Sequence, residues 1–407
     1  MRVGVFFPGF PPEIGGGHVF EYEILVALAK LAHESRHHFT LFIQDKSSLG
    51  GAIPLETSNL RIVFFNEPQP ASTPHFRSMT RRRLEKVLRK LGLMEEMSME
   101  DLFRLAVKQA KIDFFWNPSI SSISTDIPYI ATVWDIQHRL QPWFPEVSNR
   151  GEWEYREEYF SKHLRKAAFI ITGNEVGKQE LSFFYQIPEQ RFRLLPHPAP
   201  EERQVSHENV ASTLDKYSLS PGYLFYPAQF WAHKNHVNLL FALQILRDQY
   251  EKKMDLVLVG SDKGNIQYVS ELADQLGLKE QLHILGFVPR NDLMALYKGA
   301  FALTYVTFFG PENLPPLEAF SLGCSVIASS VNGAEDQLGD AALLVDPTDA
   351  RQIAEHVYHL SNDVSLRERL IASGYERARK WTSSDFVRGV FKILDEFEKV
   401  RICWPSD

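Results

Sequence analysis

Four loops in this sequence carry residue types that suit a phosphorylated ligand. The first is Gly15-Gly16-Gly17, which follows a short apolar run and precedes a helical pattern that begins near Val19. Consecutive glycines permit positive φ angles and a close approach of the backbone, which an anion-binding loop needs. A flexible turn is the alternative, because the spacing is not the GxGxxG fingerprint of a dinucleotide site.

The second and third loops follow two apolar runs in the second half of the chain. Lys234 stands at the mouth of a predicted helix, where an ammonium group can neutralise a diphosphate, and the side chain of Asn235 can cap that helix. Gly260-Ser261 opens the third loop in the same way. The alternatives are a solvated surface lysine for Lys234 and an ordinary turn for the third loop.

The fourth loop spans residues 307–320 and is the most informative. Pro315-Pro316 fixes φ at a helix start, where no backbone N–H is needed. The amides of Asn313 and Leu314 would then lie at the positive end of the helix, which suits a phosphate or sugar hydroxyls. Glu318, inside the helix, faces either this ligand or solvent.

The elements that must position these loops alternate regularly along the chain. Short apolar runs predict strands at residues 3–7, 39–43, 62–65, 114–116, 129–133 and 169–172, and again at 223–226, 256–259, 283–285, 302–305 and 325–328. Helical patterns between them predict α/β architecture, with parallel sheets covered on both faces. A proline-rich stretch at 196–200 suits a linker, so we expect Rossmann-like, doubly wound domains at 1–200 and 201–380. A final helix within 381–407 packs either on its own domain or back on the first.

Composition narrows the class of protein. The 407 residues fit two or three domains, and 44 Lys and Arg against 51 Asp and Glu give a net charge of −7. This balance argues against nucleic acid as a partner. Two cysteines cannot build a disulfide framework. The apolar segment at the N-terminus is too short and too interrupted by proline for a signal peptide, and no apolar run is long enough to span a bilayer. We therefore expect a soluble, cytoplasmic protein.

The segment Asn313–Ser329 (NLPPLEAFSLGCSVIAS) resembles the donor site of retaining, GT-B-fold glycosyltransferases of family four. Similarity continues at 285–289, 333–336 and 341–347, and more weakly in the first half at 171–175 and 193–197. The resemblance implies a GT-B fold, in which an acceptor-binding domain (1–200) and a nucleotide-sugar-binding domain (201–380) face a central cleft. It also implies retaining transfer of a mannosyl-, rhamnosyl- or glucosyl-type hexose or deoxyhexose to a glycan or lipid-linked glycan. No metal and no cofactor beyond the nucleotide-diphosphate sugar are expected.

The resemblance assigns roles to individual residues. Glu318 would hold the ribose, Lys234 the diphosphate, and the backbone at Phe287 and Val288 the base. The remaining donor-binding candidates lie on the loops described above: Gly16, Gly17, Gln229, Gly260, Ser261, Glu312, Asn313 and Leu314. The catalytic candidates are Lys234, Asp135 and His138.

Three positions depart from the family pattern. Gly310 stands where the motif has its first glutamate, with Glu312 two positions later, and Gln229 replaces an arginine that partners the lysine. The usual His-Asp pair reads Trp134-Asp135, with the next histidine at His138. An alternative is therefore a catalytically impaired subunit that binds a nucleotide or glycan and supports an active partner.

Two segments of the first half bear on the acceptor. Arg81–Leu91 has a basic, amphipathic helical pattern, which predicts either peripheral contact with the inner face of a membrane or a solvated helix of the first domain. The aromatic loop 134–144 either shapes an acceptor groove or folds back into the core.

Overall fold

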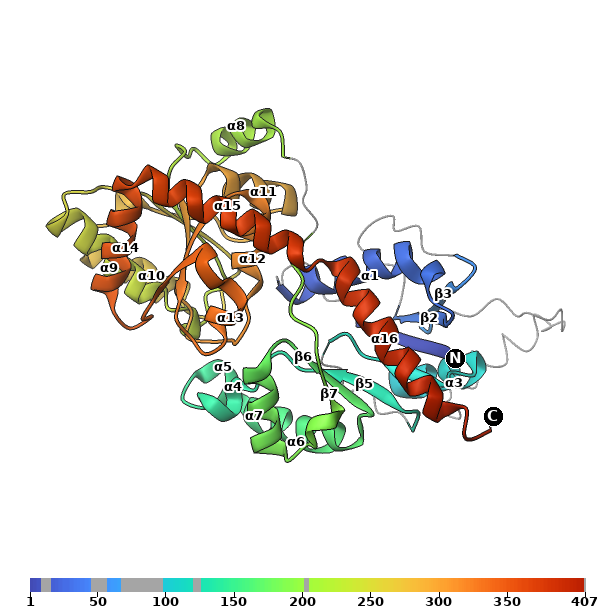
Figure 1. Ribbon diagram of the computed structural model, residues 1–407. Helices are drawn as coiled ribbons and strands as arrows, with labels where there is room; N and C mark the ends of the chain where they lie inside the picture. The colour runs from blue at the N-terminus through green and yellow to red at the C-terminus, as the bar shows by residue number, and fades with distance from the viewer. Residues whose placement is uncertain (9–15, 45–56, 67–97, 120–125, 201–204, 406–407) are drawn as a thin grey trace, which may run out of the picture.

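The computed structural model describes residues 1–8, 16–44, 57–66, 98–119, 126–200 and 205–405, and Arg81–Leu91 lies outside them. Two parallel sheets, each flanked by helices, confirm the predicted α/β architecture (Figure 1). Within the described ranges, no helix has the length and apolar character that crossing a bilayer requires.

The first domain is built on a seven-stranded parallel sheet of order β3-β2-β1-β4-β5-β6-β7. Its strands are β1 (Arg2–Phe7), β2 (His38–Ile43), β3 (Leu60–Phe64), β4 (Phe114–Trp116), β5 (Tyr129–Thr132), β6 (Phe169–Thr172) and β7 (Phe192–Leu194). Strand β1 is buried over its last five residues, as expected for a continuous apolar run covered on both faces. The strand order reverses between β1 and β4, which opens a crevice at the carboxyl ends of these strands.

The second domain repeats this plan with six parallel strands in the order β10-β9-β8-β11-β12-β13. They are β8 (Leu224–Pro227), β9 (Leu256–Val259), β10 (Leu282–Ile284), β11 (Ala302–Tyr305), β12 (Ser325–Ser329) and β13 (Ala342–Val345). Here the reversal falls between β8 and β11. The loops that follow these two strands contain Lys234 and residues 307–313, so two of the predicted loops meet at the crevice.

The helices connect and cover the strands. Those of the first domain are α1 (Gly16–Leu31), α3 (Met99–Ala110), α4 (Gln137–Leu140), α5 (Pro145–Ser148), α6 (Glu152–Lys166) and α7 (Glu175–Tyr185). The second domain has α8 (His207–Lys216), η6 (Ala232–Lys234), α9 (His236–Gln249), α10 (Ile266–Gln275), α11 (Arg290–Gly299), α12 (Leu314–Leu322), α13 (Ala334–Leu338), α14 (Ala350–Asn362) and α15 (Val364–Lys380).

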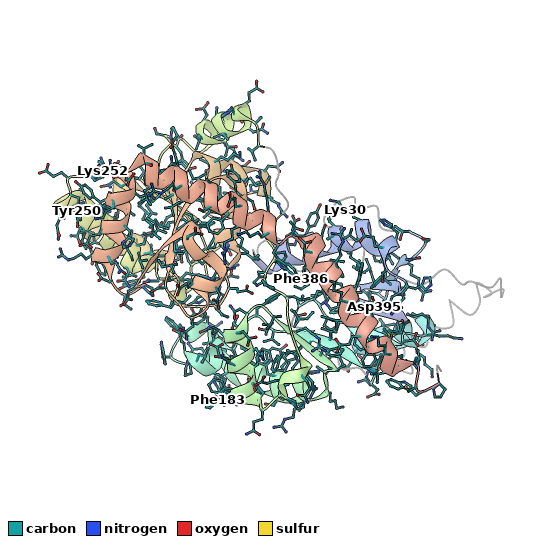
Figure 2. All side chains as sticks on the ribbon, viewed as in Figure 1. Lys30, Phe183, Tyr250, Lys252, Phe386 and Asp395 are labelled. Carbon is teal, nitrogen blue, oxygen red and sulfur yellow. The ribbon has the colours of Figure 1, made fainter. Side chains whose placement is uncertain are left out.

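The last helix, α16 (Ser383–Arg401), leaves the second domain and lies along the first (Figures 1 and 2). A capping box between Thr382 and Asp385 fixes its start. Its apolar face, which includes Phe386, is buried in the same cluster as Ile24 and Leu28 of α1. The C-terminal helix therefore completes the hydrophobic core of the first domain.

The backbone crosses between the domains twice, and the two crossings touch. The amide of Ala199 donates to the carbonyl of Trp381 at 3.2 Å, and the indole Nε1 of Trp381 donates to the carbonyl of Pro196 at 2.8 Å. Ala199 also forms a parallel bridge with Thr382. The predicted linker is thus paired with the segment that leads into α16.

Candidate functional site

Lys234 is held at the crevice of the second domain by two tyrosines. Its Nζ donates to the hydroxyl of Tyr305, at the end of β11, at 2.9 Å. Its carbonyl accepts from the hydroxyl of Tyr226, on β8, at 2.5 Å. The neighbouring Asn235 does not cap α9 as expected, because its side chain donates to the carbonyls of Val306 and Pro347 at 2.8 and 2.7 Å. Both sides of the β8–β11 crevice therefore fix the lysine.

The loops after β8 and β9 are joined by side-chain hydrogen bonds. Gln229 donates through Nε2 to Oγ of Ser261 at 3.2 Å and accepts from Nε1 of Trp231 at 2.9 Å. Gly260 has φ of 154°, and a Cβ there would lie 2.2 Å from the carbonyl oxygen of Ala228. A neutral amide thus stands at position 229, bonded to Ser261 and Trp231, where the family pattern has a cation.

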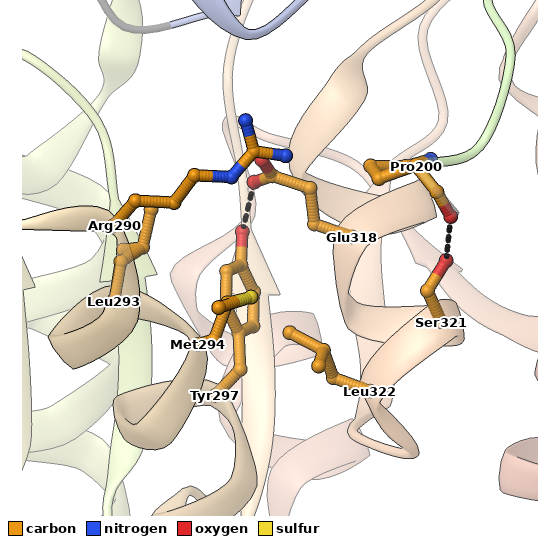
Figure 3. Close-up of a pocket in the computed structure, with 8 residues that line it drawn as sticks. All are labelled: Pro200, Arg290, Leu293, Met294, Tyr297, Glu318, Ser321 and Leu322. Atoms are coloured by element: carbon orange, nitrogen blue, oxygen red, sulfur yellow. Dashed lines mark hydrogen bonds between the residues drawn. The ribbon is translucent and has the colours of Figure 1, made fainter. Parts of the chain in front are cut away.

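Glu318 lines a pocket between α11 and α12 (Figure 3). The hydroxyl of Tyr297 donates to its Oε2 at 2.8 Å, and the guanidinium of Arg290 lies toward its carboxyl group. Burial raises the pKa of Glu318, although the hydrogen bond from Tyr297 and the charge of Arg290 oppose this shift. The linker closes the far side of the pocket, because Oγ of Ser321 donates to the carbonyl of Pro200 at 3.2 Å. The residues around the pocket are Pro200, Arg290, Leu293, Met294, Tyr297, Glu318, Ser321 and Leu322.

The loop after β10 presents one exposed aromatic ring. Phe287 is 48% exposed, whereas Val288 is buried in the core of the second domain. Gly286 adopts φ of 68°, and its carbonyl accepts from the amide of Gly260 at 2.9 Å. This loop therefore combines an exposed aromatic ring with a buried valine.

Glu312 does not point toward the pocket that contains Glu318. Its carboxyl group faces the first domain, where Oε2 accepts from the amide of His197 at 3.2 Å and lies against Gly173. Burial raises the pKa of Glu312 to about 8, partly offset by that hydrogen bond. Gly310 adopts φ of 94°, a conformation that glycine tolerates and glutamate does not favour.

The surroundings of Asn313 and Leu314 differ from the expected helix start with free backbone amides. The amide of Asn313 already donates to Oε1 of Gln337 at 2.9 Å. The side chain of Leu314 belongs to the first-domain core, and a Cβ on Gly16 would meet it at 3.4 Å. Gly16 and Gly17 open the first turn of α1, and Gly16 lies against the start of α12.

Asp135 and His138 have different environments. Asp135 follows β5 and is half-buried, and its Oδ1 accepts from the amide of Gln137 at 3.0 Å. His138 has no exposed surface; its ring stacks on Phe160, its Nε2 lies 3.1 Å from the hydroxyl of Tyr185, and burial lowers its pKa to about 4. His138 is therefore buried in the interior of the first domain, and its catalytic role stays a prediction.

Comparisons with known proteins show what the chain is similar to. The family model "Glycosyl transferases group 1" matches residues 217–377. The chain is 28% identical to O-antigen chain mannosyltransferase B of Escherichia coli over 240 residues, which cover 58% of this chain and 63% of that protein. The chain is thus similar to group 1 glycosyltransferases over residues 217–377 of its second domain. It is also 25% identical to the serotype-specific mannosyltransferase WbdA of Escherichia coli over 281 residues, covering 67% of this chain and 34% of that protein. The matches thus span less than two thirds of either relative.

Among solved structures, a glycosyltransferase from Rickettsia africae superposes with a TM-score of 0.69 at 15% identity, covering 98% of both chains. This likeness supports the GT-B architecture of the chain. The site also contains residues that sequence analysis missed. Arg290 follows the β10 loop at the start of α11 and forms an ion pair with Glu23 of α1, across the domains. The position of Arg290 shortly after a strand could have marked it as a candidate site residue. Its pairing with Glu23 could not be predicted, because the two residues are 267 positions apart in the chain.

Proposed function

We propose that this protein is a group 1 glycosyltransferase that moves a hexose or deoxyhexose from a nucleotide-diphosphate sugar to a glycan or lipid-linked glycan, with retention and without a metal ion. The observation that carries the proposal is the position of Lys234 and the 307–313 loop on either side of the β8–β11 crevice. A switch point of strand order in an open α/β sheet is where such folds bind nucleotides. The relatives named above are mannosyltransferases, which favours a mannosyl donor over the rhamnosyl and glucosyl alternatives.

The described residues suit the parts of such a donor. The carboxyl group of Glu318 would accept hydrogen bonds from ribose hydroxyls, and the backbone beside Phe287 would meet the base. Lys234 would contact the diphosphate, because its Nζ has donors left after the bond to Tyr305. With Gln229 in place of an arginine, Lys234 carries most of the side-chain charge on this loop.

Departure of the nucleoside diphosphate builds negative charge on its β-phosphate while the sugar carbon becomes cationic. Lys234 and the backbone amides at the start of α1, at Gly16 and Gly17, would stabilise this charge. We expect the leaving phosphate to take the proton of the acceptor hydroxyl, which places no demand on a protein base. Asp135, half-buried after β5, would then orient the acceptor or the donor sugar.

The acceptor side rests on the first domain. The names of the two relatives refer to the O-antigen chain and to serotype-specific mannosylation. The proposed acceptor is therefore a glycan of this kind, free or lipid-linked. A lipid-linked acceptor would place the enzyme at the inner face of the membrane, with Arg81–Leu91 as the contact. Neutralising Arg81, Arg82 and Arg83 should then reduce sedimentation with anionic liposomes, and unchanged sedimentation would contradict this contact.

A direct assay tests the transfer. Purified protein is incubated with GDP-mannose, UDP-glucose or dTDP-rhamnose and a mannose-terminated oligosaccharide, with and without EDTA. We expect one donor to yield a glycosylated product with the anomeric configuration of the donor, at a rate that EDTA does not change. If the protein binds a nucleotide but neither transfers the sugar nor hydrolyses the donor, the proposal is contradicted and the impaired binding subunit is favoured.

A further inference from the structure

A carboxylate of the first domain holds the residue next to Lys234. Glu146 lies on α5, and its Oε1 accepts a hydrogen bond from the amide of His233 at 2.8 Å and another contact from the ring Nδ1 of His233. The two side chains are only 5% and 10% exposed, respectively. His233 belongs to η6, the short turn that ends at Lys234. The contact therefore joins the first domain to the turn that carries the lysine.

The charge states of the pair are set by their surroundings. Burial lowers the pKa of His233 to about 4, and the nearby charge of Lys234 acts in the same direction, against the bond to Glu146. The ring is therefore neutral at neutral pH. Burial alone would raise the pKa of Glu146, but hydrogen bonds from the ring and backbone of His233 outweigh it and hold this pKa below its usual value. A neutral imidazole thus donates through Nδ1–H to an ionised carboxylate.

His233 is fixed equally firmly on its other side. Its ring stacks on Phe309 at 3.9 Å between centroids, with 9° between the planes. Its carbonyl accepts from the amide of Phe308 at 2.9 Å and from Oγ1 of Thr307 at 3.2 Å. His233 is therefore clamped between α5 and the segment that follows β11. Any displacement of its backbone moves Lys234, the next residue.

The same first-domain segment touches the opposite wall of the crevice. Nε2 of Gln141 donates to the carbonyl of Phe308 at 2.8 Å, and the ring of Phe144 packs edge-on against Phe309 at 5.1 Å. Residues 137–148 thus contact both loops that flank the β8–β11 crevice. Part of the aromatic loop 134–144 serves as an interdomain contact, a role that neither sequence alternative included.

We infer that Glu146 is a positioning residue: by bonding to His233 across the domain boundary, it holds Lys234 where the ammonium group meets the β-phosphate of the nucleotide. The inference rests on the proposed function. It means that Glu146 strengthens diphosphate binding without contacting the diphosphate itself. Binding of a nucleoside monophosphate, which has no β-phosphate, should not depend on Glu146.

Isothermal titration calorimetry with GDP and GMP, and with UDP and UMP as a second pair, tests this without any turnover. The proteins are wild type, Glu146→Gln, Lys234→Ala and the matched control Glu154→Gln, an exposed glutamate of α6. We expect wild type and Glu154→Gln to prefer the diphosphate at least tenfold. Glu146→Gln should lose at least threefold of that preference while the monophosphate Kd stays within twofold. An unchanged preference would overturn the inference.

The double variant Glu146→Gln/Lys234→Ala shows whether Glu146 acts through the lysine. Its diphosphate preference should equal that of Lys234→Ala alone, because the contact has nothing left to position. Additive losses would mean that Glu146 acts elsewhere, which contradicts the inference. If Glu146→Gln does not fold, Glu146→Asp, which keeps the charge but shortens the side chain, takes its place with the same expected loss. Absence of binding by wild type to either diphosphate would contradict the proposed function and this inference together, whereas binding with an unaffected preference would contradict the inference alone.

Discussion

The carboxyl group of Glu312, from the second domain, occupies the space that a side chain at Gly173 of the first domain would fill. A Cβ built at Gly173 would lie 1.5 Å from Oε2 of Glu312. The adjacent Asn174 donates through Nδ2 to the carbonyl of Pro311 at 3.1 Å. The segment before α12 is thus docked on the turn between β6 and α7, and this docking fixes how the two halves of the site face each other.

Substitution Gly173→Ala should disrupt this docking. The new methyl group overlaps the Glu312 carboxyl group, and overpacking of this kind typically costs about 1–3 kcal/mol. Thermal unfolding should show a lower melting temperature, and transfer activity should fall. The double variant Gly173→Ala/Glu312→Ala restores the space and should recover much of the stability. No recovery would show that the glycine is needed for another reason.

Glu312 should make stability depend on pH. Its pKa is about 8 in the folded protein, against an ordinary value of 4.5, so the folded state binds a proton that the unfolded chain releases. Stability should therefore fall as pH rises from about 4.5 through 8 and then level off. The melting temperature of Glu312→Gln, which stays neutral, should rise relative to wild type between pH 5 and pH 8. A difference that is constant over this range would contradict the prediction.

Lys234→Ala should lower kcat by roughly 10²–10³-fold, the usual cost of losing one group that stabilises charge in the transition state. Steady-state kinetics with saturating acceptor measure this loss. Lys253→Ala removes an exposed lysine of the same domain and should leave kcat unchanged. Lys234→Arg keeps the charge but cannot reproduce the bond geometry to Tyr305, so we expect partial activity. Wild-type kcat in Lys234→Ala would be inconsistent with the proposed mechanism.

Glu318→Gln should weaken nucleotide binding about tenfold or more, because a hydrogen bond to a charged group contributes about 1.5–3 kcal/mol. Calorimetry with GDP and UDP provides the dissociation constants. Glu335→Gln, at an exposed position of α13, serves as the matched control and should bind like wild type. Equal affinities for all three proteins would rule out Glu318 as the ribose contact.

Phe386→Ala should destabilise the first domain although the residue comes from the last helix. Phe386 is fully buried against Phe20 of α1, with ring centroids 5.5 Å apart, and truncation of a buried phenylalanine costs about 3–5 kcal/mol. Chemical denaturation measures the loss. Lys392→Ala on the exposed face of α16 should have little effect. A small effect of Phe386→Ala would mean that α16 docks only weakly.

Much of the fold was predictable because its strands are continuous apolar runs separated by helical patterns. The predicted strand at 256–259, for example, coincides with β9. The loops with Lys234 and Gly260-Ser261 were found for a related reason: polar and glycine residues that follow parallel strands all meet at one edge of the sheet.

The rest depends on contacts that no local pattern contains. His138 lies three residues after Asp135, but α4 turns its ring into the core, and only the packing of Phe160 and Tyr185 decides this. Glu312 is a donor-binding candidate because it follows the motif position at Gly310 by two residues, and its carboxyl group faces Gly173 of the other domain. The pair Glu146 and His233 is separated by 87 residues in the chain.

Ala199 and Trp381 bring the two polypeptide connections between the halves into direct contact. A single connection would let the halves swivel in any direction, whereas two adjacent ones leave mainly a bending motion about the line on which they meet. Any opening and closing of the halves should then return the same surfaces to one another, so that α5 again contacts η6 and Pro311 again contacts Asn174. Chain connectivity, and not only side-chain recognition, thereby makes closure reproducible.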